Sequence, residues 1–208
     1  MRWGWERWAG LAGILFVVLY VCAFALGIEV GASDREILEH YGDSGERDKE
    51  AVAFFFIAGA VLAFVLFSSA LRSLIAAAEG PPVTLAAIGW VGATAYVALT
   101  LAGNAVSRAP AFAAMDDVFQ LDVNSRRLLE DTGFLLFASG AIAAILFVVA
   151  VSVAALRYGI LPRWLGWGGF AVAALLPLAV FFIGFLALFL WVLAVSVVMV
   201  ARRAPTPA

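Results

Sequence analysis

Hydrophobic residues in this chain fall into five long runs that contain no Asp, Glu, Lys or Arg. The runs cover residues 8–28, 51–71, 80–107, 132–156 and 164–201. An α-helix rises about 1.5 Å per residue, so roughly 20 apolar residues cross the roughly 30 Å hydrocarbon core of a bilayer. Every run reaches that length, and the pattern therefore predicts a protein that crosses a membrane several times.

The last run fixes the expected number of helices. As a single helix its 38 residues would extend about 57 Å, nearly twice the hydrocarbon thickness. Pro177 and Gly184 interrupt the run, and we expect a tight turn between about 178 and 184. The sequence thus predicts an all-α fold: one domain, residues 1–208, with six transmembrane helices. The expected spans are about 8–28, 51–75, 83–104, 132–157, 164–179 and 184–201.

Composition agrees with this class and excludes others. The chain is 65% hydrophobic and 13% charged, against about 45–50% and 25% in soluble domains. The net charge of -2 argues against nucleic acid as a partner, because such binding needs a basic surface. The expected partners are the lipid bilayer and either another membrane protein or a second copy of this chain.

Charge also predicts an orientation. One side of the six-helix path carries seven basic and two acidic residues, and the other carries six basic and thirteen acidic residues. The seven lie in short segments at helix ends, where basic residues mark the cytoplasmic side, and tryptophans gather at the same interface. We expect a multi-pass protein of the bacterial cytoplasmic (inner) membrane with both termini in the cytoplasm.

The two segments on the acidic side, 29–50 and 104–131, have different patterns. In the first, Ser33 and Glu36 match a capping box, which predicts a short helix that continues to about Tyr41. Ile37, Leu38 and Tyr41 would share one side of this helix. The second is amphipathic, and we expect a short amphipathic helix that lies along the outer membrane face or caps the bundle. Acidic side chains of both segments, and His40, are expected to be solvated.

Residues that could do chemistry are few. His40 is the only histidine and Cys22 the only cysteine, and they lie at different expected depths, so no catalytic pair, metal site or cofactor site is predicted. Two pairs remain as weak candidates for ligand binding: Asn104 with Arg108, one helical turn apart, and the adjacent carboxylates Asp116 and Asp117. No catalytic residue is assigned.

Small residues recur at four-residue spacing in five of the expected helices, where they would let helix backbones approach closely. The pairs are Ala9 and Gly13, Gly59 and Ala63, Gly89 and Ala93, Gly140 and Ala144, and Gly169 and Ala173.

One part of the sequence has a pattern that is shared with a known family. It is the stretch Leu161-Pro162-Arg163-Trp164-Leu165-Gly166, followed by an apolar hairpin, Leu190-Trp191-Val192-Leu193 and Arg202-Arg203. It resembles bacterial six-helix integral membrane proteins of unknown function, a family abundant in actinobacteria. The likeness in layout covers nearly the whole chain. That family has no agreed activity, so the resemblance implies the fold and transfers no functional residue.

Three functions stay open at this point. The first is a non-enzymatic integral membrane protein, an accessory or partner-binding subunit, because nucleophile, metal and redox motifs are lacking. The alternatives are a small permease for a neutral or weakly polar molecule, and a lipid-modifying membrane enzyme. A polar cavity that reaches the membrane midplane would favour transport, whereas a dry core of alanine and phenylalanine would favour the first function.

Overall fold

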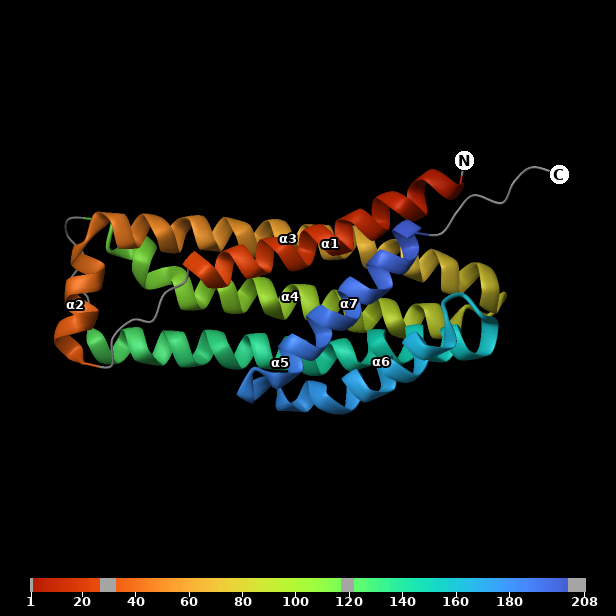
Figure 1. Ribbon diagram of the computed structural model, residues 1–208. Coiled ribbons are helices and arrows are strands. Elements are labelled where there is room, and N and C mark those ends of the chain that lie inside the picture. The colour runs from red at the N-terminus through yellow and green to blue at the C-terminus, as the bar shows by residue number, and fades with distance from the viewer. Residues whose placement is uncertain (1, 27–32, 117–121, 202–208) are drawn as a thin grey trace.

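The computed structural model describes residues 2–26, 33–116 and 122–201. They form helices throughout (Figure 1). The elements are α1 (Arg2–Leu26), α2 (Asp34–Gly42), α3 (Ser44–Glu79), α4 (Thr84–Ala113), α5 (Val123–Tyr158), α6 (Arg163–Leu175), the 3-10 helix η1 (Leu176–Phe181) and α7 (Ile183–Ala201).

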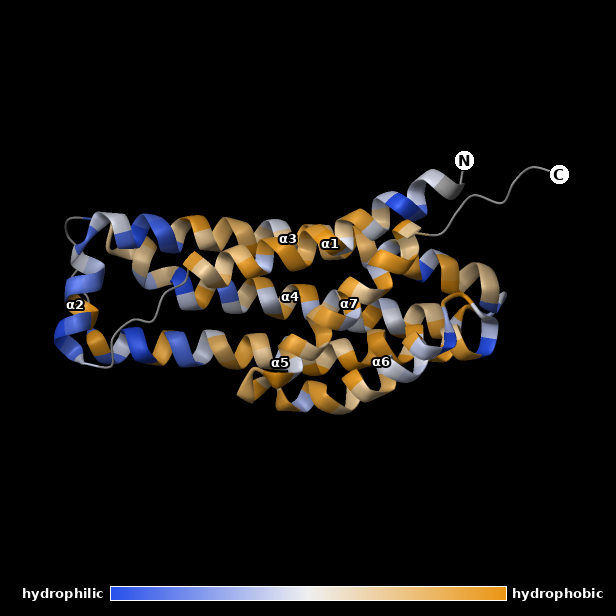
Figure 2. Cartoon of the chain, viewed as in Figure 1, coloured by the Kyte–Doolittle hydropathy of each residue, from blue (hydrophilic) through white to orange (hydrophobic). Residues whose placement is uncertain are grey.

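Six of these segments are long and apolar enough to cross a membrane: α1, α3, α4, α5, α6 with η1, and α7. Hydrophobic residues occupy the middle of the bundle, and hydrophilic residues gather toward its two ends (Figure 2). The predicted all-α bundle of six transmembrane helices is confirmed, and the chain is a multi-pass membrane protein.

Helices α3, α4 and α5 continue past their uncharged runs at the end near α2. With 36 residues each, α3 and α5 extend about 54 Å, far more than the hydrocarbon thickness. The outer segment predicted at 104–131 is shorter in the structure, because α4 continues to Ala113 and α5 begins at Val123. The amphipathic piece expected within it lies mostly outside the described residues. Charged residues are tolerated in these end turns because the turns project beyond the hydrocarbon.

Side-chain caps set where the polar helices begin. Ser33 and Glu36 form the predicted capping box of α2, and the hydroxyl and backbone amide of Ser33 lower the pKa of the exposed Glu36. The carboxylates of Asp43 and Asp122 accept hydrogen bonds from the first backbone amides of α3 and α5. In α2, Ile37 and Tyr41 are buried.

Leu38 corrects the expectation for that helix. Its side chain is exposed, so Leu38 does not share the buried side of α2 with Ile37 and Tyr41. One residue along a helix turns the side chain by about 100°, which moves Leu38 off the packed stripe.

The last apolar run folds back on itself, as predicted. Helix α6 tightens into η1, whose second residue is Pro177, and the chain reverses at Phe182 with a φ of 63°. A side chain at Gly184 would meet the backbone nitrogen of Ala179 at 2.8 Å, so a glycine is needed where α7 starts against η1. The reversal yields two short spans from one uncharged run.

Glycines bring the helices into close contact. A Cβ atom on Gly103 of α4 would lie 2.7 Å from the carbonyl oxygen of Gly133 on α5, which requires that the two backbones nearly touch. The glycine in each of the five predicted small-residue pairs also faces a side chain of a neighbouring helix. Close backbone approach therefore joins α4 to α5, α1 to α7 and α5 to α6.

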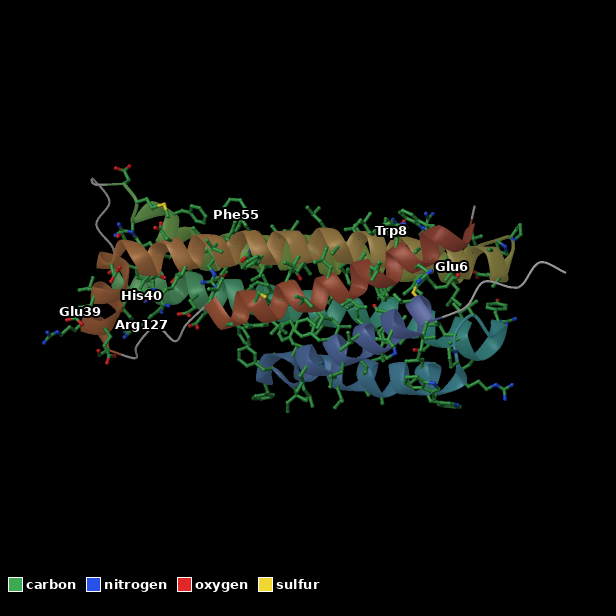
Figure 3. All side chains as sticks on the ribbon, turned by 45° about the horizontal axis from the view of Figure 1, so that its top comes forward. Glu6, Trp8, Glu39, His40, Phe55 and Arg127 are labelled. Carbon is green, nitrogen blue, oxygen red and sulfur yellow. The ribbon has the colours of Figure 1, made fainter. Side chains whose placement is uncertain are left out.

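Aromatic rings fill the centre of the bundle. Phe64 packs against Phe16, Tyr96 and Phe147, with ring centroids 5.1, 4.8 and 5.4 Å apart. All four rings are at most 2% exposed. By contrast, Phe55 points outward from α3 at 65% exposure (Figure 3), as a lipid-facing side chain does. The middle of the molecule is a dry aromatic core.

Candidate functional site

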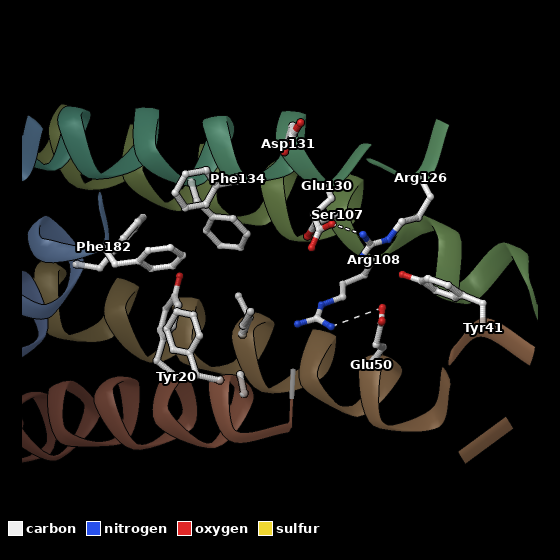
Figure 4. A pocket seen from close by; sticks show the side chains of 15 residues that line it. Tyr20, Tyr41, Glu50, Ser107, Arg108, Arg126, Glu130, Asp131, Phe134 and Phe182 are labelled. Carbon is white, nitrogen blue, oxygen red and sulfur yellow. Dashed lines mark ion pairs between the residues drawn. The ribbon is translucent and has the colours of Figure 1, made fainter. Parts of the chain in front are cut away.

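One end of the bundle is built by the three long helices. Helix α2 lies across the end where α3 begins, α4 ends and α5 begins, whereas α1 and the α6–α7 hairpin stop short of it (Figure 1). Below α2 lies a cavity of about 420 Å³, within the usual size range of small-molecule sites. We call it the end cavity. Its lining residues are Tyr20, Ala23, Phe24, Tyr41, Glu50, Ile57, Ser107, Arg108, Arg126, Glu130, Asp131, Phe134, Phe137, Phe182 and Phe185 (Figure 4).

Three of the charged lining residues are direct sequence neighbours of the uncharged runs. Glu50 directly precedes the run 51–71, Arg108 directly follows 80–107, and Asp131 directly precedes 132–156. Antiparallel neighbours α3, α4 and α5 bring these borders to one level of the bundle. The charged part of the end cavity therefore lies at the boundary between apolar and polar surface, the level of lipid head groups.

Glu50 is the centre of one charged group. Its side chain is 6% exposed, and its Oε1 atom lies 2.9 Å from Nε2 of His40. Its other oxygen, Oε2, lies 3.5 Å from Nη1 of Arg108, whose side chain is 18% exposed. A buried carboxylate is costly unless it is paired and hydrogen-bonded, and here α2 and α4 each supply one partner.

Arg126 is the centre of the second group. Its guanidinium pairs through Nη1 with Glu130, one turn later in α5, and lies over the ring of Tyr41, 5.8 Å from the centroid. Burial, helped by the negative charge of Glu50, raises the pKa of the Tyr41 phenol, which stays protonated at neutral pH. Arg47 donates a hydrogen bond of 2.6 Å to the Tyr41 carbonyl oxygen and fastens α2 to α3.

The other half of the end cavity is aromatic. Tyr20 and Phe24 come from the end of α1, Phe134 from α5, and Phe182 and Phe185 from the start of α7. Phe24 and Phe182 are 51% and 58% exposed, so the aromatic wall continues onto the outer surface of the bundle. The end cavity is therefore amphipathic, with ion pairs at one end and phenylalanines at the other (Figure 4).

The four predicted ligand-binding residues do not lie together in the structure. Arg108 lines the end cavity. Asn104 is fully buried, and its Nδ2 atom donates a hydrogen bond of 3.0 Å to the carbonyl oxygen of Phe54, so it ties α4 to α3. Asp116 follows the end of α4 and does not line the end cavity. Asp117 lies outside the described residues.

His40 contradicts the expectation that it is solvated. Its side chain is 12% exposed and lies against Glu50, with Glu39 and Arg127 close by at the same end of the molecule (Figure 3). The expectation that all acidic side chains of the outer segments are solvated fails for the same reason. The Asp43 turn between α2 and α3 folds His40 back onto Glu50, a contact that local sequence rules do not contain.

Most of the charged site was missed from the sequence: Glu50, Arg126, Glu130 and Asp131. A usable signal existed, because a charged residue that borders an apolar run lies at a known depth. Arg126 carried no such signal, since it stands several residues before its run and is buried only through the cover by Tyr41.

Within the residues that the structure describes, no three or more His, Cys, Asp or Glu side chains are placed so that they could hold a metal ion together. Beneath the end cavity, the hydroxyls of Tyr20, Tyr96 and Thr100 are buried, and the geometry gives them no hydrogen-bond partner among the described residues. The Tyr96 ring belongs to the aromatic core, where it packs against Phe64.

Fold and site together define a multi-pass membrane protein with an amphipathic cavity at one end. Comparisons of the chain with protein-family models, with curated proteins and with solved structures found no match. The function must therefore be argued from the end cavity itself.

Proposed function

We propose that this protein is a non-enzymatic binding protein of the membrane that holds an amphipathic small molecule in the end cavity. The observation that carries the proposal is the cavity's division into a charged and an aromatic half. A ligand with a polar group and an apolar part satisfies both halves, whereas a purely polar or purely apolar molecule leaves one half unmatched.

Binding fits the site better than catalysis does. Glu50 and Glu130 are engaged in ion pairs with Arg108 and Arg126, and the hydroxyl of Ser107 donates to the Asn104 carbonyl of its own helix. A nucleophile needs a base within hydrogen-bond reach, and Ser107 has a backbone carbonyl there instead. This favours a binding role over the lipid-modifying enzyme considered from the sequence.

Binding also fits better than permeation. A permease needs a polar route to the membrane midplane. The hydroxyls of Tyr20 and Tyr96 start such a route, but the rings of Phe16, Phe64 and Phe147 fill the bundle below them. A ligand in the end cavity would have to displace this packed core to cross the membrane.

The test is purification in a mild detergent, followed by mass spectrometry of whatever small molecules stay bound. Wild-type protein is expected to retain an amphipathic molecule near one per chain. Ala23→Phe, which fills the cavity from a buried position, is expected to lose it. Ala25→Phe is the matched control, because Ala25 is exposed on the same helix and does not line the cavity.

Equal retention by wild type, Ala23→Phe and Ala25→Phe would contradict the proposal, since the bound molecule would then lie elsewhere. Binding to a membrane-protein partner or to a second copy of this chain stays a prediction. The same purification tests it, because a stable partner would co-purify or raise the mass of the complex.

For location we propose the bacterial cytoplasmic membrane, with both termini in the cytoplasm and the end cavity on the outer side. Basic residues support this orientation, because Arg7, Arg72, Arg157 and Arg163 all lie near helix ends on the side opposite α2. A reporter that is active only in the cytoplasm, fused after Ala208, should give a signal. Activity of a periplasmic reporter there would refute this orientation.

A further inference from the structure

We propose that the end cavity recognises the head group of a zwitterionic phospholipid with a primary ammonium group, the phosphoethanolamine type. The phosphate would bind Arg108 and Arg126, the ammonium would bind Glu130 and Asp131, and the acyl chain would leave past the phenylalanines. This inference rests on the proposed function, because it names the class of amphiphile that the cavity binds.

The balance of charge calls for a ligand that carries both signs. Arg108 is paired with Glu50, and Arg126 with Glu130. Asp131 lines the same cavity, and the structure records no ion pair for it within the described residues. Two cationic and three anionic residues therefore line one space, and a ligand with a single anionic charge would meet a surplus of carboxylates.

The two arginines form the anion-binding part. Their side chains reach into the cavity from α4 and α5 (Figure 4), with 18% and 7% of their surfaces exposed. Guanidinium groups hold five N–H donors in a planar fork that matches phosphate oxygens. The ion pair of Arg108 uses only its Nη1 atom, so Nε and Nη2 can serve a phosphate. Arg126 pairs with Glu130 through Nη1 and lies over the Tyr41 ring, so a phosphate would share its guanidinium with these two side chains.

The carboxylates form the cation-binding part. Glu130 is 51% exposed, and Asp131, the next residue in α5, is also exposed. Oxygen acceptors suit a primary ammonium, which offers three N–H donors. A quaternary choline group offers none and is instead held by aromatic cages. The ring of Tyr41, which is nearest to this charged end, already lies under Arg126, so ethanolamine fits better than choline.

The aromatic half accounts for the lipid chain. A volume of about 420 Å³ suits a head group and the start of a chain but not a whole phospholipid. The partly exposed rings of Phe24 and Phe182 extend the apolar wall to the bundle surface, where acyl chains of the bilayer would lie. The charged end stands at the level of lipid head groups, so a lipid could enter without leaving its usual depth.

The experiment titrates purified protein in nonionic micelles with single-chain lipids of one acyl length, and measures the lipid retained after gel filtration by mass spectrometry. The probes are lysophosphatidylethanolamine, lysophosphatidylcholine, lysophosphatidylglycerol and free phosphoethanolamine. We expect the ethanolamine lipid to bind at least about tenfold more tightly than the other three probes.

Variants separate the two parts of the site. Arg108→Gln should weaken all three lipids by about tenfold, because it removes a charge-assisted contact to the shared phosphate. Asp131→Asn, an exposed change that leaves the fold undisturbed, should bring the ethanolamine lipid down to the level of the glycerol lipid. Arg157→Gln, at the opposite end of α5, is the matched control and should bind as wild type does.

Each contrary result has a distinct meaning. Equal or tighter binding of the glycerol lipid, unaffected by Asp131→Asn, overturns the head-group assignment while amphiphile binding stands. Free phosphoethanolamine binding as tightly as its lipid overturns the lipid assignment in favour of a soluble phosphate ester. Failure of wild type to retain any of the lipids, together with equal behaviour of Ala23→Phe and Ala25→Phe, removes the proposed function itself.

Discussion

Replacing Gly133 with alanine tests whether α4 and α5 touch where they form the wall of the end cavity. The added Cβ atom would lie 2.7 Å from Cβ of Ser107 and 2.8 Å from both the carbonyl oxygen of Gly103 and the backbone nitrogen of Ser107. None of these atoms can rotate away, so the two helices must separate by several tenths of an ångström. Overpacking of this kind costs about 1–3 kcal/mol.

Alanine also favours the helix over glycine by about 1 kcal/mol, which would hide part of the cost. Gly168→Ala is the matched control, because Gly168 lies within α6 and a Cβ atom there meets nothing within 4 Å. The free energy of unfolding of the two variants should therefore differ by about 1–3 kcal/mol, the overpacking cost alone. Gly133→Ala should be the less stable of the two.

The assay is unfolding in mixed micelles by a denaturing detergent, followed by far-ultraviolet circular dichroism. Gly133→Ala should also retain less of the amphiphile, because Ser107 lines the end cavity. If Gly133→Ala proved as stable as Gly168→Ala, the backbones of α4 and α5 would not be in contact at this level, and the cavity wall described here would be wrong.

Three further predictions follow from the same geometry. Glu50→Gln should lower the free energy of unfolding by about 1–3 kcal/mol in the same assay, since it leaves His40 and Arg108 without their carboxylate partner. The control Glu39→Gln, at an exposed ion pair, should change it by less than about 0.5 kcal/mol. Phe181→Cys in a Cys22→Ser background should react with an impermeant thiol reagent outside intact cells, because Phe181 ends η1 at the turn that joins two transmembrane spans. Labelling only after permeabilisation would invert the topology. Capping hydrogen bonds lower the pKa of Asp122 below its ordinary value of 3.8, so the stability that Asp122 contributes is present above that pH and is lost as the pH falls below it. Asp122→Asn should keep the cap and remove this part of the loss of stability in acid, and an unchanged dependence of stability on acid pH would contradict this.

The transmembrane helices could be predicted because the controlling information is local. Run length, Pro177 and Gly184 were enough to place six spans and the hairpin. The ends of α3, α4 and α5 were missed because hydropathy reports where a helix must be apolar, not where it must stop. Beyond the hydrocarbon, the start of a helix is set by its N-cap, which is Asp43 for α3 and Asp122 for α5.

The site could be predicted only in part because it depends on contacts between distant segments. Arg108 was proposed as the residue one helical turn from Asn104, yet its partner Glu50 comes from a different helix. Asn104 was paired with Arg108 by helical spacing, but its side chain bonds to the α3 backbone instead. His40 and Arg126 are shielded from water because α2 lies across the end of the bundle. The hydrophobic pattern of the sequence does not show where α2 is placed.

The end cavity exists because the six transmembrane segments have unequal lengths. With 19 residues, α7 extends about 28 Å, which matches the hydrocarbon, while α3, α4 and α5 continue past it. Six equal helices would close over the aromatic core and leave no space, and the three long helices alone would leave Glu50 and Arg126 facing water. Helix α2 changes this by covering the projecting turns, so that water is partly excluded while the side facing α1 and α7 stays apolar and exposed at Phe24 and Phe182. The buried charges of Glu50 and Arg126 are tolerated because each is paired within the protein. The opening of this charged group toward the apolar side is the physical reason to look for its ligand among the lipids.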